Sequence, residues 1–539
     1  MDRVWNEKAA AEYYRDGYWA PRTIYDLFLQ QVEQRGGAEA LVDGERRVTY
    51  RDLKDEIERC AAVLRARGVA AGDVVTVQTP NRIEFATVML ALELIGAIAN
   101  NVSTDYRSSE LEYILNYSKS TTYVCAEGFR GFSYLKMMQE LRERIPSLKL
   151  LVSVSGEGEG GDPLYLRTAL PDATPLTPNH WTRPHPDDVM RLAFTSGTTG
   201  DPKGVMHSHN TTIFPVLTMN RGMCIDPTSV QMIFMPTTLN TGYLSLLQTL
   251  LGGARGVLVE HFAVDTALKT IADERVTAFS TPPAALVMML DSPLLAETDI
   301  SSLRVIKSGG APASLELLRR IEDQLSAHLI ESYGMLETGF HCHTTVDDNP
   351  TEVVGTVGRP VEGMELSIRT SAGEAVPTGE EGELLARGPG VHLGYIGNTA
   401  ANKSSFTSDG WFVTGDLGRL DANGRLKISG RKKEIINRAG KKYFPREIEE
   451  LLLTLPSIHD VAIVGLPDRR TGERSCACVV PAAGASVTLE DLVGFLEERV
   501  ARYKLPEKLV IVESFPRTST GKVRRPALIE QIMAEDVAG

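Results

Sequence analysis

The sequence predicts an α/β protein with a large N-terminal domain of layered sheets, a β subdomain and a small α+β domain at the C-terminus. Strand-like apolar runs alternate with segments of helical period from about residue 50 to about 330, a pattern typical of helices packed on sheets. From about 355 to 428, Asp-Gly and Asn-Gly turns predict hairpins. A chain of 539 residues exceeds the size of one core, so more than one domain is expected.

The expected elements follow the chain in order. Short apolar runs bounded by turn residues predict strands, and longer runs with a 3.6-residue period predict helices. Expected strands are DVVTVQTP (73–80), TTYVCAE (121–127) and GARGVLVE (253–260), and DTALKTIADERVTAFSTP (265–282) predicts a helix followed by a strand. The run FATVMLALELIGAIAN (85–100) predicts a buried helix, because it carries Glu93 and is too short to span a bilayer.

The sequence pattern changes near residues 428–433, where hairpin sequences give way to a lysine-rich stretch, and this change predicts the main domain boundary. The β subdomain, about 355–428, includes the hairpin sequences GELLARGPGV and GWFVTGDLGRLDANGRLKIS. A lysine-rich stretch, GRKKEIINRAGKKYF, follows at 430–444. Residues 434–539 then alternate between helical and strand-like segments, as expected of a compact α+β domain. We therefore expect an N-terminal domain over 1–428 and a C-terminal domain over 434–539.

Composition narrows the classes of partner. The formal charge of −13 and the pI near 5.4 argue against a nucleic acid or an anionic membrane as the main partner. The amino terminus has no apolar stretch that resembles a signal peptide, and no membrane span is expected. Six cysteines without a CxxC pair do not form a disulfide or zinc framework. We expect a cytoplasmic protein.

Two features invite a cofactor interpretation that the residues do not support. The pairs His207/His209 and His341/His343 have the spacing of one strand face, but neither has further ligands at a recognised spacing, so structural histidines are expected. The segment GEGEGG (156–161) matches GxGxxG formally. Because DPLY follows and two glutamates would repel phosphates, an exposed loop is expected there.

The stretch FTSGTTGDPKGVMHSH (194–209) is unusually rich in glycines and hydroxyls. Glycines let a backbone approach a ligand closely, hydroxyls donate hydrogen bonds, and Lys203 adds a mobile positive charge. Such a set suits a polyanion such as a triphosphate. No glycine precedes Lys203, so the spacing of the common P-loop is not met. A flexible linker is the alternative, but it would not explain the apolar flank MRLAF.

Several long motifs in order give the chain a family resemblance. TSGTTGDPKG resembles the phosphate loop of the ANL adenylating enzymes, which include acyl-CoA synthetases, adenylation domains of peptide synthetases and luciferases. ESYGMLETG (331–339) resembles their adenylate motif, TGD (414–416) the ribose motif, GRKKEIINRAGKKYFPREIE (430–449) the hinge, and PRTSTGK (516–522) the catalytic-lysine motif. The likeness covers nearly the whole chain and implies an AMP-forming acyl-CoA synthetase.

The resemblance implies roles in a two-step reaction with ATP, Mg²⁺ and CoA. Lys522 would bridge the incoming carboxylate and the α-phosphate, Glu337 would be catalytic and bind Mg²⁺, and Lys433, in a hinge at 429–433, would let the C-terminal domain change pose. Tyr333 would stack on adenine, while Asp416 and Arg431 would hold the ribose. The full set of expected nucleotide and CoA contacts is Thr195, Ser196, Gly197, Thr198, Thr199, Gly200, Lys203, Glu331, Ser332, Tyr333, Gly334, Thr338, Asp416, Arg431, Arg438, Gly440, Lys441 and Lys442.

One position departs from the family pattern. Leu336 stands where the family usually has a threonine or serine whose hydroxyl meets the phosphate. Thr338 or a water molecule would have to replace it, and a non-catalytic nucleotide-binding protein is an alternative. Because Lys203, Glu337 and Lys522 are all present, an active enzyme is the preferred interpretation.

Charged residues and a sequence likeness at the amino terminus indicate the acceptor of the acyl group and the carboxylic acid substrate. Arg438, Lys441 and Lys442 carry enough positive charge to meet the phosphates of CoA, and a solvated face is the alternative. An enzyme that loads a separate acyl carrier protein is the second candidate. The opening YYRDGYWAPRTIYDLF resembles that of aryl-acid and alicyclic-acid ligases, so we expect a small cyclic, aromatic or polycyclic carboxylic acid. Its expected contacts are Leu239, Asn240, Gly309, Gly310, Ala311 and Gly339.

Overall fold

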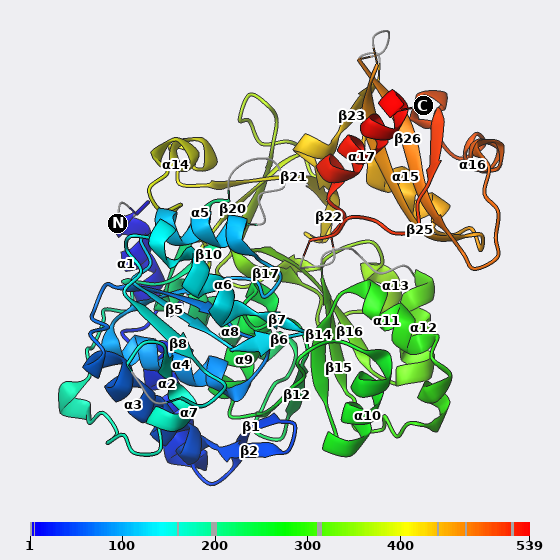
Figure 1. The fold of residues 1–539 in the computed structure, drawn as a ribbon. Coiled ribbons are helices and arrows are strands. Elements are labelled where there is room, and N and C mark those ends of the chain that lie inside the picture. The colour runs from blue at the N-terminus through cyan, green and yellow to red at the C-terminus, as the bar shows by residue number, and fades with distance from the viewer. Residues whose placement is uncertain are drawn as a thin grey trace. The chain divides into compact units, whose positions relative to one another are not determined.

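The computed structural model describes residues 3–4, 6–158, 161–195, 202–309, 315–438, 441–468, 472–518 and 522–538, without the side chains of 315, 316, 442 and 535–538. The chain divides into two compact units (Figure 1). The N-terminal unit comprises Met1–Thr195, Pro202–Glu365 and Ala386–Phe412. Leu366–Leu385 and Val413–Gly539 belong to the C-terminal unit. This division groups part of the expected β subdomain with the C-terminal residues, while the predicted boundary and hinge stay predictions.

The larger sheet of the N-terminal unit has nine strands within the described residues, in the order β18-β17-β16-β15-β14-β12-β13-β1-β2. Its middle strands are parallel, as expected where helices connect successive strands. Helices α10 (Val264–Glu274), α11 (Pro283–Leu290) and α12 (Leu315–Leu325) lie together beside β14, β15 and β16 (Figure 1). The strands are β1 (Glu39–Asp43), β2 (Arg46–Thr49), β12 (Val230–Ile233), β13 (Arg255–Leu258), β14 (Ala278–Thr281), β15 (Val305–Gly309), β16 (His328–Met335), β17 (Gly339–His343) and β18 (Arg359–Pro360).

The second sheet has seven strands in the described part of the unit, in the order β11-β10-β4-β3-β5-β8-β9. It ends in an antiparallel pair, β10 (Val189–Phe194) with β11 (Gly204–Ser208), so the glycine-rich stretch connects two paired strands. The remaining strands are β3 (Val74–Gln78), β4 (Ile98–Asn101), β5 (Thr122–Cys125), β8 (Leu150–Ser153) and β9 (Leu164–Tyr165); β6 (Gly128–Phe129) and β7 (Phe132–Ser133) form a separate hairpin.

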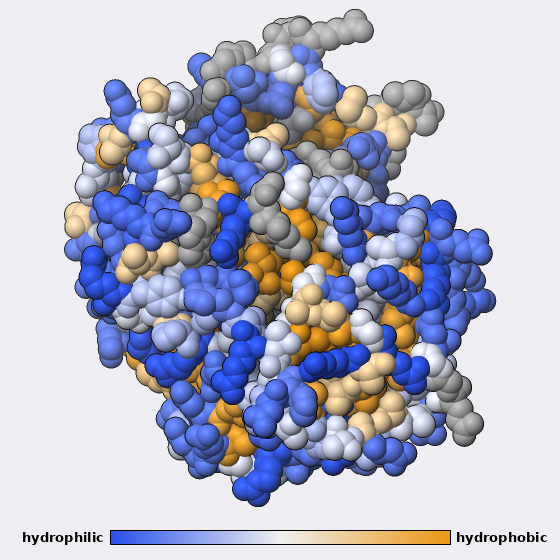
Figure 2. Space-filling view, turned by 90° about the vertical axis from the view of Figure 1, so that its left-hand side faces the viewer, coloured by the Kyte–Doolittle hydropathy of each residue, from blue (hydrophilic) through white to orange (hydrophobic). Residues whose placement is uncertain are grey.

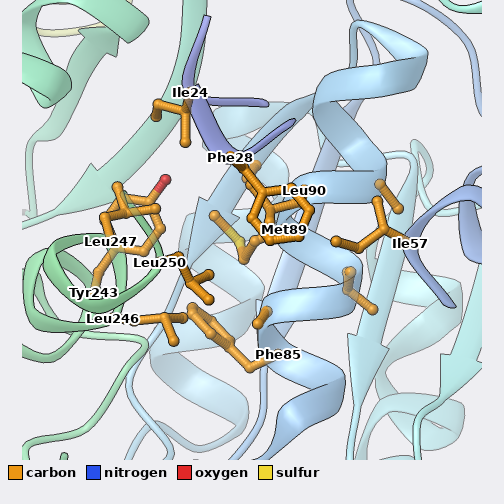
Figure 3. Close-up of a cluster of buried hydrophobic side chains, with 14 of the residues drawn as sticks. Ile24, Phe28, Ile57, Phe85, Met89, Leu90, Tyr243, Leu246, Leu247 and Leu250 are labelled. Atoms are coloured by element: carbon orange, nitrogen blue, oxygen red, sulfur yellow. The ribbon is translucent and has the colours of Figure 1, made fainter. Parts of the chain in front are cut away.

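Helices fill the interior of the N-terminal unit. Figure 3 shows side chains of α2 (Ile24–Arg35), α3 (Tyr50–Ala66), α4 (Ile83–Ile95) and α9 (Asn240–Gly252) meeting in one apolar cluster. Its labelled members are all buried. The opposite side of α9 is polar: Ser245 donates to Ser280 of β14 and Thr249 to Gln231 of β12. One helix thus packs apolar residues on other helices and hydroxyls on the larger sheet.

Most helices of the N-terminal unit are capped by side chains, which satisfy the first backbone N–H groups of each helix. Thr23, Thr49 and Ser208 each form a capping box before α2, α3 and α8. The helices of this unit not yet given bounds are α1 (Glu7–Arg15), α5 (Ser108–Ser118), α6 (Tyr134–Leu141), α7 (Leu166–Ala169), α8 (His209–Gly222), α13 (Pro350–Val353) and α14 (Thr399–Ser405). Its 3₁₀ turns are η1 (Arg142–Arg144), η2 (Pro178–His180) and η3 (Pro293–Glu297).

The C-terminal unit contains two sheets. In the first, β19 (Glu365–Arg369), β20 (Gly382–Arg387), β21 (Phe412–Leu420) and β22 (Leu426–Arg431) lie side by side. In the second, β26 (Gly472–Pro481) lies between β25 (Ile458–Asp468) and β27 (Lys508–Ile511) and also pairs with β23 (Ile436–Arg438), which pairs with β24 (Lys441–Tyr443). The helices are α15 (Pro445–Leu452), α16 (Leu489–Leu496) and α17 (Arg525–Ala538), with 3₁₀ turns η4 (Lys432–Glu434) and η5 (Arg502–Lys504).

The structure confirms the predicted strands and the alternation with helices, and corrects two local expectations. The apolar run 85–100 is a helix only to Ile95, because Gly96 adopts a left-handed φ of 75° and the chain continues as β4. His207 and His209 do not share a strand face, since Ser208 caps α8 and places His209 in the helix. In GEGEGG, the described residues before 159 form no helix or strand.

The charged residues of the sequence lie mainly outside these cores. Figure 2 shows a face on which hydrophilic residues predominate toward the edges and hydrophobic ones appear mainly toward the centre. Among the described helices, we find none with the length and apolar character needed to cross a membrane.

Candidate active site

The predicted phosphate loop is closed at its base by two hydrogen bonds. The Thr195 N–H donates to the Lys203 carbonyl over 3.0 Å, and the Lys203 N–H donates to the Thr195 hydroxyl over 3.1 Å. These bonds continue the β10–β11 ladder by one step beyond its last pair, Phe194 with Gly204. The base of the loop is therefore fixed. Of the predicted phosphate contacts, Ser196, Gly197, Thr198, Thr199 and Gly200 lie outside the described residues.

Glu337 lies in a tight turn between β16 and β17. Its side chain is only 8% exposed, and its backbone carbonyl accepts a hydrogen bond of 2.8 Å from the His392 N–H. The turn requires glycine at its end: Gly339 has a φ of 64°, and a Cβ there would lie 2.7 Å from Pro215. The predicted metal-binding carboxylate is thus held by the backbone on both sides.

Tyr395 joins the Lys203 and Glu337 side chains. Its hydroxyl donates to Glu337 Oε1 over 3.1 Å, and Lys203 Nζ lies 4.9 Å from the centre of its ring. Burial and the Glu337 carboxylate raise the pKa of Tyr395 above its ordinary value, so the phenol stays protonated and donates. The phosphate-loop lysine and the metal-binding carboxylate therefore form one connected arrangement.

Tyr395 belongs to a segment that extends the second sheet. Its backbone pairs with Val205 of β11, and the Met206 N–H donates to the Gly394 carbonyl. Asn402 exchanges two side-chain hydrogen bonds with the Tyr395 backbone. We did not predict Tyr395, because a tyrosine 58 residues after Glu337 carries no spacing signal; its place beside β11 is a tertiary property.

Leu336 has a structural explanation in place of the missing hydroxyl. Its side chain packs against a small apolar cluster of Val205, Tyr395 and Ala401. Its carbonyl accepts a hydrogen bond of 2.7 Å from His207 Nε2. Burial lowers the pKa of His207 to about 3, so the ring is neutral and Nδ1 accepts from Thr211.

The Thr338 hydroxyl, one expected replacement for the hydroxyl that Leu336 lacks, is engaged within the turn, and its role toward a phosphate stays a prediction. The Thr338 side chain is fully buried and forms a 2.7 Å hydrogen bond with His341 Nδ1. His341 and His343 both lie on β17, as their spacing predicts. Burial lowers the pKa of His341 to about 3. The histidines of this region are therefore neutral residues that hold the turn.

The expected adenylate motif forms the end of β16. Glu331 and Ser332 are buried, and the Ser332 hydroxyl donates to the Ser308 carbonyl. Tyr333 is half-buried and meets the His341 ring edge to face at 4.8 Å. Gly334 is exposed, and a Cβ there would lie 2.1 Å from the Gly339 carbonyl. The predicted stacking of Tyr333 on adenine stays a prediction.

The predicted acyl contacts lie at the ends of β15 and β17 and at the start of α9. Gly309 ends β15 and pairs with Ser332, while Gly339 starts β17. Leu239 precedes α9 and Asn240 is its first residue, both half-buried. Gly310 and Ala311 lie outside the described residues.

A buried arginine that we did not predict orients Asn240. Arg191 of β10 is 1% exposed, and both its terminal nitrogens donate to Asn240 Oδ1 over 3.1 Å. Arginine has no acceptor, so the amide oxygen must face it and the Nδ2 donors must point elsewhere. Burial lowers the pKa of Arg191 to about 10. The guanidinium also lies 4.3 Å from the Tyr243 ring centre.

The C-terminal unit brings the two predicted ribose contacts together. Asp416 of β21 and Arg431 of β22 are cross-strand neighbours, and Arg431 Nε lies 3.2 Å from Asp416 Oδ1. Gly415 adopts a φ of 74°, which explains the glycine of TGD. Asp416 is 4% exposed and its backbone N–H binds the Thr414 hydroxyl. The pair is in place to act as one unit.

The predicted hinge and CoA-binding residues have different surroundings. Lys433 is exposed in η4, between β22 and β23. Arg438 donates to the carbonyls of Tyr503 and Leu505 and forms an ion pair with Glu507. The exposed Lys441 lies over the Tyr503 ring at 5.3 Å. Lys442 belongs to β24, and Gly440 lies outside the described residues.

Lys522 is exposed at the end of a short loop. Its backbone N–H donates to the Thr518 hydroxyl and its carbonyl accepts from the Thr518 N–H over 2.8 Å. Arg517 and Val523 form an isolated antiparallel bridge beside them. The loop base therefore fixes the backbone of Lys522 while its side chain lies at the surface.

The residues around Glu337 fit Mg²⁺ that arrives with a nucleotide. We find no cluster of three or more metal-ligating side chains in the described ranges. Mg²⁺ is usually bound by one or two carboxylates together with substrate phosphates. Glu337 supplies such a carboxylate, oriented by Tyr395, on the same unit as Lys203. Glu337 would hold the ion, which would neutralise phosphate charge.

Comparison with known families defines the class of protein. The family described as AMP-binding enzyme matches residues 28–396, and the AMP-binding enzyme C-terminal domain matches residues 447–522. Together these matches include the phosphate loop, the Glu337 turn and Lys522. The chain belongs to the AMP-binding enzyme family, within the ANL superfamily, and is an adenylate-forming ligase.

Relatives named for different acids resemble the chain over its full length. It is 33% identical to the 2,3-dihydroxybenzoate-AMP ligase of Bacillus subtilis, covering 99% of this chain and 98% of that one. It is also 33% identical to the medium-chain fatty-acid–CoA ligase of Escherichia coli, covering 98% and 94%. The crystal structure of ATP-bound MatB from Rhodopseudomonas palustris superimposes with a TM-score of 0.85 at 27% identity, covering 95% and 99%.

Proposed function

We propose that this protein activates a ring-bearing carboxylic acid with ATP and transfers the acyl group to CoA. In the first step, a carboxylate oxygen attacks the α-phosphorus and the bond to pyrophosphate breaks. In the second, the CoA thiol attacks the acyl carbon, the bond to the AMP oxygen breaks, and the thiol proton is released. AMP, pyrophosphate and a thioester are the products. A cytoplasmic location belongs to this proposal.

The arrangement of Lys203, Tyr395 and Glu337 carries the proposal. Phosphoryl transfer depends mainly on positioning and charge neutralisation. The arrangement provides a cation and a carboxylate at the base of a loop of glycines and hydroxyls, with their relative positions set by one tyrosine. Mg²⁺ on Glu337 would add charge neutralisation at the phosphates. We propose that Lys522 neutralises charge on the α-phosphate in the same step.

The contact between Arg191 and Asn240 supports an acid with a polar substituent. The two relatives are named for an aromatic acid and for a straight-chain acid, so likeness alone does not decide between them. A straight hydrocarbon chain offers no acceptor for a hydrogen bond. Because Arg191 donates to Asn240 Oδ1, the Nδ2 donors of Asn240 point away from Arg191 and can bind an acceptor on the acid. An acid with a polar substituent near its carboxylate fits this site better.

Transfer to a separate carrier protein is the second candidate. One relative is named as a CoA ligase and the other as an AMP ligase, a name that states no thiol acceptor, so the likeness does not decide the acceptor. Arg438, one of the predicted CoA contacts, is already engaged by Glu507 and by two carbonyls. This engagement favours a structural role for Arg438 and leaves Lys441 as the described exposed cation of the predicted set.

Pyrophosphate release across a panel of carboxylic acids, with and without free CoA, tests both candidates. Turnover of a ring acid to its CoA thioester is the expected result. Formation of an adenylate that CoA does not discharge would identify the carrier-protein candidate. Absence of pyrophosphate release with every acid, under conditions where ATP binds, would contradict adenylation and leave a non-catalytic nucleotide-binding protein.

A further inference from the structure

A buried lysine lies in the sheet below the predicted acyl contacts. Lys307 is the third residue of β15 and is 2% exposed. Its side chain faces the side of the sheet covered by α8 and α9, because Val305, two residues earlier, belongs to the same apolar cluster as Tyr243 and Leu246 of α9. Gly309, two residues later, lies about 7 Å further along the same face.

The surroundings of Lys307 support this placement. Its register partner on β14 is Ser280, which accepts from Ser245 of α9. Its Nζ lies 3.3 Å from the centre of the Phe340 ring. Phe340 follows Gly339, one of the predicted acyl contacts. The amine therefore adjoins the place where the distal part of an acid would lie if Gly309 and Gly339 flank its carboxylate.

Lys307 has no oppositely charged partner among the residues that the structure describes. Within the described residues, no carboxylate forms an ion pair with Nζ and no hydrogen bond of this amine is found. The closest described attraction is the face of Phe340. Burial lowers the pKa of Lys307 to about 7. Burying an ammonium without a partner is costly, so a protein that needs only to fold gains nothing from lysine at this position.

A second buried cation lies on the same interior side. Arg191 contacts Asn240 and the Tyr243 ring of α9, and in the described part of the chain it has no carboxylate partner either. Its Nε is buried without a hydrogen-bond acceptor. The helix α9 thus lies between two buried cations that no described acid neutralises. Arg191, and Lys307 in its protonated form, place positive charge around a predicted substrate site, and an anionic ligand would favour that protonated form.

We propose that Lys307 determines specificity by binding a second, anionic oxygen group of the acid, remote from the carboxylate that reacts. A second carboxylate and an ionised phenol share this chemistry. The inference rests on the proposed function and names its substrate class: ring acids with an acidic oxygen substituent. An apolar acid would leave the Lys307 amine buried without a partner, which is how such a site discriminates strongly between related substrates.

Matched pairs of acids test the proposal on the unaltered protein. Each pair consists of a benzoic acid with a hydroxyl or a second carboxylate at one ring position, and its partner with a methyl group there. For at least one position we expect kcat/KM for the oxygen-bearing acid to exceed that for its partner by about tenfold or more. Preference for the methyl acid at every position would overturn the inference, yet adenylation itself would still be demonstrated.

Variants then assign the preference to Lys307. Lys307→Met keeps the length of the side chain and removes the amine, so it should fold, and its preference should fall by about tenfold or more through loss of the oxygen-bearing acid. Lys307→Gln should retain part of the preference. Lys269→Met, which replaces an exposed lysine of α10, is the control and should change nothing. Equal changes for both acids of a pair would indicate a purely structural lysine.

The hydroxyl and carboxylate series separate the two sources of anionic oxygen. Preference within the carboxylate series alone identifies a dicarboxylic acid, and preference within the hydroxyl series alone identifies a phenolic acid. Failure of the proposed function is distinct from both, because no acid would then release pyrophosphate.

Discussion

The Glu337 turn and the Lys522 loop are both predicted to act on ATP, but they are held in different ways. Glu337 is buried, with its carboxylate bonded by Tyr395, its carbonyl by His392 and the preceding carbonyl by His207. Lys522 is exposed on a short loop closed by Thr518. The turn is pre-organised by contacts with residues distant in the sequence, whereas the loop is closed by the nearby Thr518 and anchored at its base by the Arg517–Asp460 ion pair. The N-terminal unit therefore holds a rigid part of the predicted site.

The largest effect is expected from Lys522→Ala. The change should lower adenylation by about 10²- to 10³-fold, because it removes a cation from the charge that develops at the α-phosphate. Thioester formation from preformed acyl-adenylate should be nearly unchanged. Separate assays of pyrophosphate release and of adenylate discharge by CoA provide the measurement. Equal losses in both half-reactions would contradict the role assigned to Lys522.

Lys433→Pro tests the other exposed lysine, in the predicted hinge. Proline fixes φ near −65° and removes a backbone donor, so it should restrict the backbone change that the second step requires. We expect thioester formation to fall by about tenfold or more while adenylation is retained. Lys433→Ala, which removes the side chain alone, should have little effect. Unaltered thioester formation in the proline variant would refute the hinge assignment.

Tyr395→Phe tests how the Glu337 turn is held. The ring below Lys203 stays, but the hydrogen bond to Glu337 is lost, so kcat/KM for MgATP should fall by about tenfold. Tyr117→Phe is a matched control, because the Tyr117 hydroxyl bonds the neighbouring Ile396 carbonyl. If the two variants behave alike, Tyr395 contributes only to packing.

The smallest effect is a pH dependence of stability in the N-terminal unit. Burial lowers the pKa to about 3 for His207, His341 and His392 and to about 4 for His209. In the unfolded chain their pKa is about 6.5, so below that pH the unfolded state binds more protons and stability falls as pH decreases toward 4. Burial raises the pKa of Glu93 and opposes the trend, but as one group against four.

Tryptophan fluorescence isolates this effect. The sequence has four tryptophans, all before residue 413, and the three that the structure describes, Trp19, Trp181 and Trp411, belong to the N-terminal unit. The only histidine of residues 413–539, His459, is exposed. The tryptophan-detected thermal midpoint should fall by about 4 °C or more between pH 7 and pH 5. A midpoint that stays constant over this range would show that the histidines are not held neutral.

Motifs predicted the parts of the site that are contiguous in the chain. Short sequence stretches predict the Thr195–Lys203 loop, the turn at Glu337 and the Asp416–Arg431 pair. The structure places the loop and the turn at the ends of strands, and the pair across the β21–β22 ladder. Glycine positions such as Gly339 and Gly415 carry backbone requirements that a sequence displays directly.

The partners of these motifs could not be predicted. Arg191 meets Asn240 across 49 positions, Tyr395 meets Glu337 across 58, and His207 meets Leu336 across 129. Each pair depends on which strand faces which helix, and a buried arginine or lysine within an apolar strand has no periodicity of its own. Lys307 in β15 is such a residue.

The way the chain alternates between the units has a practical consequence for dividing the protein. Leu366–Leu385 leaves the N-terminal unit and Ala386–Phe412 returns to it, so β20 and β21 each begin in one unit and end in the other. A cut at residue 412 would remove β19 and β20 from the sheet that β21 and β22 complete. A fragment of 413–539 would therefore expose unpaired strand edges, and exchanging the C-terminal segment between relatives calls for a junction after β22.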